Sequence, residues 1–325
     1  MKLNYFYQTT PTITANLRQL EVLKQVFDLL PQLPNVELNI RRHSLLKSSL
    51  FSARIEGNQL QLNQLTRRDR KTQEKIEVYN ILDALNWIYS PKTPKNLSKD
   101  SIIKLHQFVL KDLNSTGKFR TQPSAIFNQA GIAVYLPPPP QDIPELINQL
   151  IKQINSKKES GFIKAATSHF AFEKIHPFMD GNGRVGRLLS TYILKFFNYD
   201  YRGLVNFEEY LENHRSTYYD LLSIEKKDIT EFVEFFLQAL SVQAKKVFEK
   251  LKSKKQETPE DRLLPRRQEI LAVIRDHKLV SFDFIARRFR SISSRSLHYD
   301  LQHLTQKNFI KKLGATRGAL YSPTL

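Results

Sequence analysis

The chain has 325 residues, of which 41% are hydrophobic and 25% are charged, as expected for a folded protein of about two domains. It contains no cysteine, which excludes disulfides and thiolate metal sites, and no apolar run approaches the length that spans a membrane. The first residues lack a continuous apolar signal core, so we expect a cytoplasmic protein. The formal charge of +18 favours a polyanionic partner such as ATP, nucleic acid or an acidic protein.

The N-terminal part is predicted to be helical. Apolar residues between Leu17 and Leu30 recur at helical spacing, and the pattern stops at Pro31. Further along, a helix that ends at Gly57 would carry Glu56 in its last turn, because glycine favours the left-handed conformation that closes helices. Ser52 lies one helical turn before Glu56, so we expect its hydroxyl to steady the helix that carries the carboxylate.

Two further amphipathic helices are predicted over residues 75–89 and 98–110. Ser98 or Ser101 is expected to cap the second of them. His106 lies among the apolar residues of that helix, which favours a packed or hydrogen-bonded histidine over a catalytic one.

The helical pattern breaks in the stretch 117–140. Residues 124–128 and 132–136 are short apolar runs with a turn at Gly131 between them, which predicts a β-hairpin that the prolines at 137–140 close. The backbone groups of an exposed hairpin edge lack partners, so such an edge can bind a peptide as an added strand. A hairpin that only covers the core is the alternative.

The stretch His176–Arg187, with the sequence His-Pro-Phe-Met-Asp-Gly-Asn-Gly-Arg-Val-Gly-Arg, joins two apolar segments that are predicted to be helices. Gly181 and Gly183 allow positive φ, so successive N–H groups can turn toward one point at the start of the second helix and bind an anion. Arg184 and Arg187 are three residues apart, so they share a helix face and can both reach a polyphosphate.

The same stretch carries two groups suited to chemistry. His176 has an imidazole, whose free pKa of about 6.5 suits a general base. Asp180 can hold a Mg²⁺ ion that phosphate oxygens also ligate. No strand precedes this loop and no Walker lysine follows it, which argues against a P-loop NTPase. A glycine-rich turn with solvated charges is the structural alternative.

This stretch resembles the signature of the Fic/Doc family, His-x-Phe-x-Asp/Glu-Gly-Asn-Gly-Arg-x-x-Arg, at every fixed position. The resemblance implies a mainly α fold with a Fic-type helical core, and transfer of AMP from ATP to a hydroxyl side chain of a target protein. It implies that His176 is the base and that Asp180 is the Mg²⁺ ligand. The phosphates of ATP would be bound by Gly181, Asn182, Gly183, Arg184 and Arg187.

Ser52, Glu56 and Gly57 are similar to the inhibitory pattern Ser/Thr-x-x-x-Glu-Gly/Asn of the same family, and their place before the catalytic stretch resembles the class with an N-terminal inhibitory helix. Glu56 would pair with Arg187 and occupy the arginine that the γ-phosphate needs. An intact Glu56 is equally compatible with an enzyme that removes AMP, in which the carboxylate orients a water. A simple helix end is the structural alternative.

The resemblance also assigns residues around the nucleotide and the target. The hairpin would be a flap that holds the target segment as an added strand beside the histidine, through Ile126, Phe127, Val134 and Tyr135. A helix is predicted to begin in the stretch 207–222, where Asn213 is the candidate for the adenine edge and Tyr218 for stacking on the base.

Residues 262–325 form a separate basic segment, with thirteen Lys/Arg against four Asp/Glu, or 13 − 4 = +9. The expected order of three helices, strand, turn and strand resembles a winged helix. The third helix offers polar residues early, where recognition helices meet base edges, and Arg317 would lie in the wing. Many winged helices bind protein instead, so both partners stay open. The polar residues near the start of the third helix are Arg295, Ser296, His298 and Tyr299.

We therefore expect a helical N-terminal region 1–95, a Fic catalytic core 96–244, a linker 245–261 and a winged-helix-like domain 262–325. The leading hypothesis is an autoinhibited protein adenylyltransferase that acts on a Ser, Thr or Tyr hydroxyl, with ATP as substrate and Mg²⁺ as its ion. The alternatives are removal of AMP through Glu56, or a DNA-binding regulator whose core only senses nucleotide. The partners would be a target protein, DNA, or a second copy of the chain.

Overall fold

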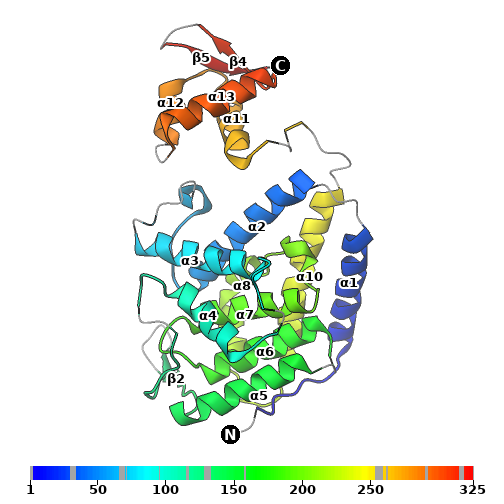
Figure 1. The fold of residues 1–325 in the computed structure, drawn as a ribbon. Coiled ribbons are helices and arrows are strands. Elements are labelled where there is room, and N and C mark those ends of the chain that lie inside the picture. Colours follow the sequence, from blue (N-terminus) through cyan, green and yellow to red (C-terminus); the bar gives the residue numbers. More distant parts are fainter. Residues whose placement is uncertain are drawn as a thin grey trace. The chain divides into compact units, whose positions relative to one another are not determined.

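The computed structural model places the chain in two compact units (Figure 1). The first unit comprises residues 1–31, 41–65 and 70–253, and the second comprises residues 32–40, 66–69 and 254–325. No helix in the part of the chain that is described is long and apolar enough to cross a membrane. The described residues are 3–29, 34–65, 70, 72–94, 96–114, 117–127, 133–156, 159–252, 259–260, 263–289, 292–314 and 318–324.

The first unit consists mainly of helices, one of which, α2, belongs to it from Arg41 onward. Short 3₁₀ turns lie at Leu62–Leu65, Pro140–Asp142 and Tyr201–Gly203. The helices are α1 (Pro11–Leu29), α2 (Pro34–Ile55), α3 (Gln73–Ile88), α4 (Lys99–Val109), α5 (Ile143–Asn155), α6 (Gly161–Ile175), α7 (Asn182–Phe196), α8 (Glu208–Asn213), α9 (Arg215–Ser223) and α10 (Thr230–Lys252).

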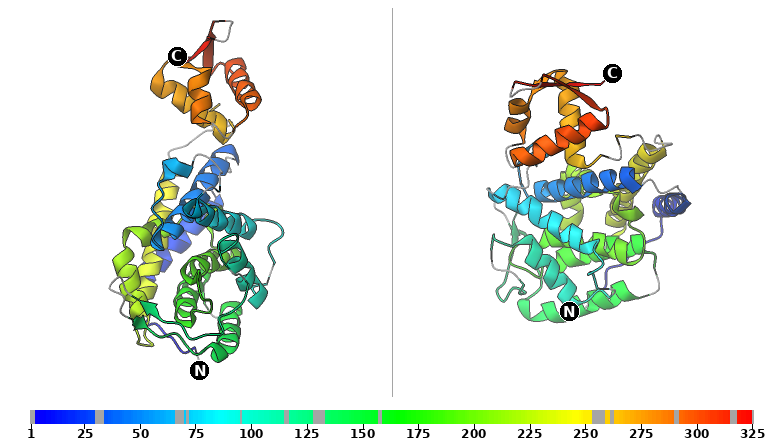
Figure 2. Two further views of the ribbon diagram at one scale, coloured as in Figure 1. Left: turned by 90° about the vertical axis from the view of Figure 1, so that its left-hand side faces the viewer. Right: turned by 45° about the horizontal axis from the view of Figure 1, so that its top comes forward.

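Helices α6 and α7 form the centre of this unit. Nearly every residue of α6 is buried, and so is almost all of α7. A helix that is buried all round needs neighbours on every face. Accordingly α5 and α10 pack against α6, α3 and α4 pack against α7, and α1 lies along α10 (Figure 2). The loop that joins α6 to α7 is therefore held at both ends by buried helices.

The predicted hairpin lies between α4 and α5, as β1 (Ile126–Phe127) and β2 (Ala133–Tyr135). The strands are antiparallel, with Ile126 paired to Tyr135. The Tyr135 hydroxyl donates a hydrogen bond to the Lys174 carbonyl of α6 at 2.9 Å, which ties β2 to the central helix. The turn 128–132 and the side chains of Phe127 and Val134 lie outside the described part of the chain.

Two helix boundaries in the first unit differ from expectation. The first helix begins earlier, at Pro11, because the Thr10 hydroxyl accepts a hydrogen bond from the Ile13 N–H at 3.1 Å and proline is favoured at the first helical position. The stretch 207–222 forms two helices instead of one, since the backbone of His214 (φ −121°, ψ 37°) is not helical.

Helix α10 also extends further than predicted. It continues to Lys252, so residues 245–252 of the expected linker are helical and belong to the first unit. Of the rest of that range, residues 253–258 and 261 lie outside the described part of the chain.

The second unit contains the three expected helices and the two expected C-terminal strands, and a further short strand lies between the first two helices. Its three strands form an antiparallel sheet in the order β3-β5-β4. Ser293 caps the third helix, since its hydroxyl accepts a hydrogen bond from the Ser296 N–H at 3.2 Å. Arg317, expected in the wing, lies outside the described residues. The elements are α11 (Pro265–His277), β3 (Val280–Ser281), α12 (Phe282–Arg288), α13 (Ser294–Gln306), β4 (Ile310–Leu313) and β5 (Leu320–Pro323).

Helix α13 is held against α11 by apolar and charged contacts. Its buried residues Leu297, Leu301 and Leu304 belong to one apolar core with the buried side of α11. Asp300 is fully buried, and its carboxylate accepts hydrogen bonds from Arg266 and, at 2.9 Å, from Arg267. The opposite face of α13 stays exposed to solvent.

Candidate active site

The loop between α6 and α7 begins with a histidine in an unusual backbone conformation. His176 ends α6 in the left-handed region (φ 47°, ψ 61°), which is uncommon for a residue with a side chain. The two residues that follow are buried, and the Phe178 ring stacks on His106 with the ring centres 3.8 Å apart. His106 is therefore a packed residue beneath the loop, as its apolar neighbours in the sequence predict.

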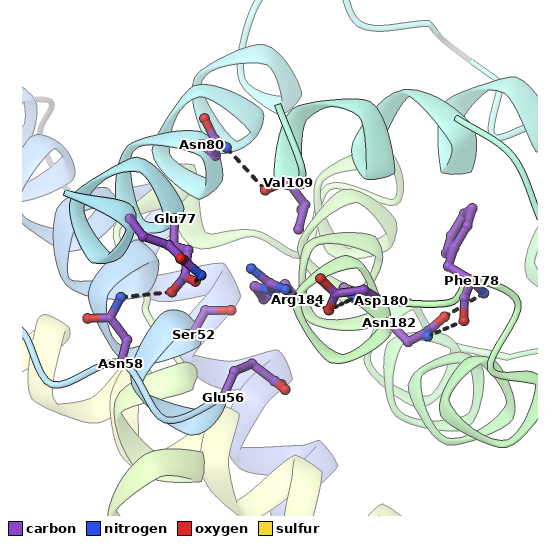
Figure 3. Close-up of polar contacts among 12 residues, drawn as sticks. Ser52, Glu56, Asn58, Glu77, Asn80, Val109, Phe178, Asp180, Asn182 and Arg184 are labelled. Atoms are coloured by element: carbon purple, nitrogen blue, oxygen red, sulfur yellow. Dashed lines mark hydrogen bonds and ion pairs between the residues drawn. The ribbon is translucent and has the colours of Figure 1, made fainter. Parts of the chain in front are cut away.

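Asn182 closes the loop on itself. Its Oδ1 accepts a hydrogen bond from the Phe178 N–H at 2.9 Å, and its Nδ2 donates to the Phe178 carbonyl at 2.8 Å (Figure 3). Both ends of the Asn182 amide therefore hold the loop closed at Phe178. Gly181 (φ 78°) turns the chain into α7, whose first N–H groups and dipole favour an anion at this place.

The end of α2 brings Glu56 to this loop. Gly57 (φ 101°) closes the helix, and the Asn58 side chain donates hydrogen bonds to the Glu74 carbonyl and to Glu77 Oε2, both at 2.9 Å. These bonds fix the end of α2 on α3. Figure 3 shows Glu56 extending from α2 toward the catalytic loop.

Arg187 lies at the centre of the polar contacts. Its side chain is 1% exposed, and its Nη2 is 2.8 Å from Glu56 Oε1, so the predicted pair is present. Its Nε and Nη2 also donate to the Ser52 hydroxyl and carbonyl, each at 2.9 Å, and Nη1 is 3.5 Å from the Tyr218 hydroxyl. Ser52 therefore binds the arginine itself, whereas we expected it to steady the helix that carries Glu56.

The Glu56 carboxylate also packs against the first turn of α7. A Cβ atom placed on Gly183 would lie 2.2 Å from Glu56 Oε1, so only glycine leaves room for the carboxylate. Desolvation opposes the ionisation of Glu56, but the charge and hydrogen bond of Arg187 outweigh it and hold the pKa of Glu56 below its usual range. An ionised carboxylate therefore occupies a place that suits a phosphate.

His176 is in the form that a general base requires. Burial lowers the pKa of His176 to about 4, because the imidazolium loses hydration inside the protein. The imidazole is consequently neutral at pH 7 and can accept a proton.

Asp180 and Arg184 complete the polar rim of the loop. Asp180 Oδ1 accepts hydrogen bonds from the Gly181 N–H and, at 2.9 Å, from Arg184 Nη2, while half of the Asp180 side chain is exposed. The described residues contain no cluster of three or more groups that could ligate a metal. Mg²⁺ fits this site as an ion shared between Asp180 and phosphate oxygens, which is a common arrangement for Mg²⁺.

The two residues expected to contact adenine differ in their exposure to solvent. Asn213 is exposed at the end of α8. Tyr218 is 1% exposed, and its hydroxyl is 2.7 Å from His169 Nε2, so its ring belongs to the core. The ring that α9 exposes is Tyr219, which is 41% exposed and donates a hydrogen bond to the Ile55 carbonyl at 2.9 Å. The resemblance assigned Tyr218 to the base, and the sequence alone did not show which of the two adjacent tyrosines is buried.

Glu173 is a second residue that the sequence analysis missed. It lies on α6 one turn before His176, is 9% exposed, and its Oε1 has no hydrogen-bond partner among the described residues. A Cβ on Gly186 would lie 2.1 Å from this oxygen. Burial raises the pKa of Glu173 to about 8, so the carboxyl is protonated at neutral pH.

A pH series tests this assignment. The pKa of Glu173 in the folded chain, about 8, is above its free value of 4.5, so the folded state holds the proton more tightly and loses stability as pH rises between these values. Glu173→Gln removes the ionisation, so its melting temperature should rise relative to wild type between about pH 5 and about pH 8.5. Glu231→Gln, at an exposed position, is the control. A difference between Glu173→Gln and wild type that is independent of pH would contradict the assignment.

Comparison with known proteins agrees with the geometry of the site. The Fic/DOC family model matches residues 96–194, which contain the hairpin, α4–α6, the loop and most of α7. The chain is 30% identical over 250 residues to the protein adenylyltransferase Fic of Aedes aegypti, which covers 70% of this chain and 48% of that protein. It is 28% identical over 249 residues to that of Drosophila melanogaster, with coverage of 70% and 48%. The chain thus spans about half the length of the curated relatives it matches.

Solved structures share the fold. A Fic family protein from Desulfovibrio desulfuricans has a TM-score of 0.66 and 22% identity, with coverage of 98% of this chain and 97% of that one. Fic-1 from C. elegans has a TM-score of 0.60 and 21% identity, with coverage of 74% and 73%. The chain therefore carries a Fic/DOC family domain over residues 96–194.

Proposed function

We propose that the chain is an autoinhibited protein adenylyltransferase, which transfers AMP from ATP to a Ser, Thr or Tyr hydroxyl of a target protein or of itself. The observation that carries this proposal is the neutral imidazole of His176 beside an anion site that Arg184 and Arg187 flank. The curated relatives are protein adenylyltransferases named Fic, which supports the same activity for this chain.

The reaction follows from these groups. His176 accepts the proton of the target hydroxyl, the oxygen attacks the α-phosphorus in line, and the bond from that phosphorus to the β-phosphate oxygen breaks. Pyrophosphate leaves with the electron pair of that bond. Catalysis is mainly positioning and charge stabilisation, to which the N–H groups of α7, Arg184 and Arg187 contribute. Mg²⁺, held by Asp180, would neutralise part of the phosphate charge.

Autoinhibition follows from competition for one guanidinium. Glu56 and the γ-phosphate are both anions that need Arg187, and the buried guanidinium already binds Glu56 and Ser52. In the inhibited state ATP would bind with its γ-phosphate displaced and its α-phosphorus misaligned for attack. A misplacement of about 1 Å can cost on the order of 10²-fold in rate.

Replacing the base should separate chemistry from binding. His176→Ala should lower the rate of AMP transfer by about 10²–10⁴-fold, the usual contribution of a general base. Nucleotide affinity should change little, because the phosphates are held by α7 and the arginines. Transfer of labelled AMP and ATP titration are the measurements, with the exposed His277→Ala as control. Equal transfer by His176→Ala and wild type would rule out His176 as the base.

Releasing Arg187 should activate the enzyme. Glu56→Gly should raise adenylylation strongly, and adding Arg187→Ala in that background should abolish the gain, since the γ-phosphate then loses the guanidinium for which Glu56 competes. Labelled ATP with the purified chain and with lysate reports self- and target modification. If Glu56→Gly is no more active than wild type on any acceptor, Glu56 is not inhibitory. If it instead loses an AMP-removing activity, Glu56 serves the reverse reaction.

Besides a target protein, we propose DNA as a partner of the chain, bound by the second unit. The reason is the set of residues that α13 exposes. Arg295, His298 and Tyr299 are exposed on it, Tyr299 to 62%. Asp300, the one acidic residue in the sequence of α13, is buried and paired with arginines. The exposed face is therefore suited to base edges and phosphates.

Salt and substitution distinguish DNA from a protein partner. For the full chain on DNA, log affinity should fall with log salt at a slope of roughly −0.9 per neutralised phosphate. Arg295→Ala should relax sequence preference, whereas Lys311→Ala, on the exposed part of β4, should weaken all sites alike. Absence of DNA retention at low salt would favour a protein partner.

A further inference from the structure

Arg120 connects the catalytic loop to both ends of the hairpin. It lies between α4 and β1, is 4% exposed, and its Nε donates a hydrogen bond to the His176 carbonyl at 2.8 Å. Its Nη1 donates to the Gln122 carbonyl at 3.1 Å, and its Nη2 donates to the Pro138 carbonyl. Its backbone N–H donates to the Pro177 carbonyl at 2.9 Å.

The four acceptors come from three segments of the chain. The carbonyls of His176 and Pro177 belong to the catalytic loop, that of Gln122 lies just before β1, and that of Pro138 lies just after β2. Hydrogen bonds from a charged donor are about twice as strong as neutral ones. One guanidinium therefore holds the loop and the hairpin in a fixed mutual position.

The contact with His176 has a particular role. A left-handed backbone at a residue with a side chain is strained and persists only where its surroundings hold it. Arg120 binds the carbonyl of this residue and, through its own N–H, the next carbonyl along the chain. The direction of the imidazole depends on that backbone, so Arg120 acts on the base through the main chain.

We propose that Arg120 is a positioning residue that couples the hairpin to His176, so that an acceptor segment held by the hairpin meets a correctly placed base. The proposal rests on the proposed adenylyltransferase function. Lysine cannot replace Arg120, because a single ammonium cannot span three carbonyls in the geometry of a planar fork. Arg120→Lys therefore keeps the charge and removes the coupling.

The test uses Arg120→Lys and Arg120→Ala in the full chain with Glu56→Gly, and Lys118→Ala, at an exposed position two residues earlier, as control. For self-adenylylation, kcat should fall on the order of 10²-fold in both Arg120 variants while KM for ATP stays unchanged. Added guanidinium ion should restore part of the rate of Arg120→Ala and none of the rate of His176→Ala.

Hydrogen exchange gives a readout that needs no turnover. In Arg120→Lys, the amides of the catalytic loop and of β1 and β2 should both exchange faster, while those of α10 stay as in Lys118→Ala. If Glu56→Gly is inactive but exchange rises in both segments, the adenylyltransferase function is wrong and the coupling stands. The proposal would be overturned if kcat and the exchange rates of both segments stayed unchanged. It would also be overturned if the fall in kcat were accompanied by a comparable loss of ATP affinity and by a lower melting temperature.

Discussion

The site depends on one buried guanidinium, that of Arg187. A buried charge is costly unless it is paired and hydrogen-bonded, and Arg187 meets this condition through Glu56, Ser52 and Tyr218. Ser52 lies on α2 and Glu56 directly follows that helix, which is far from α7 in the sequence. Exchange of Glu56 for a phosphate would keep the charge paired, so the proposed autoinhibition and the proposed catalysis can use the same arginine.

The surrounding sequence makes room for this exchange. Gly183 admits the Glu56 carboxylate to the first turn of α7, and Gly186 admits the protonated carboxyl of Glu173. The side chain of Asn182 holds the loop through hydrogen bonds to Phe178, and the first N–H groups of α7 can face an anion. The glycines of α7 thus make room in the site, and the carboxyl groups that occupy this room come from other segments of the chain.

Features formed by residues close together in the sequence could be predicted, whereas contacts between residues far apart in the sequence could not. The loop, its histidine and the helix that follows are local, so their pattern predicted them, and the Glu56–Arg187 pair followed from a family resemblance. The burial of Tyr218, the contact of Ser52 with Arg187, and the environment of Glu173 depend on packing between distant helices. No periodicity encodes such contacts, and the same holds for the carbonyls that Arg120 binds.

We propose that Glu56 and the γ-phosphate compete for Arg187, and a pair of crystal structures tests this most directly. Wild type and Glu56→Gly would each be crystallised with Mg²⁺ and a non-hydrolysable ATP analogue. The γ-phosphate should contact Arg187 only in Glu56→Gly, and the α-phosphate should take a different position in wild type, where Glu56 stays paired. An identical triphosphate position in both structures, with Glu56 still on Arg187 in wild type, would contradict it.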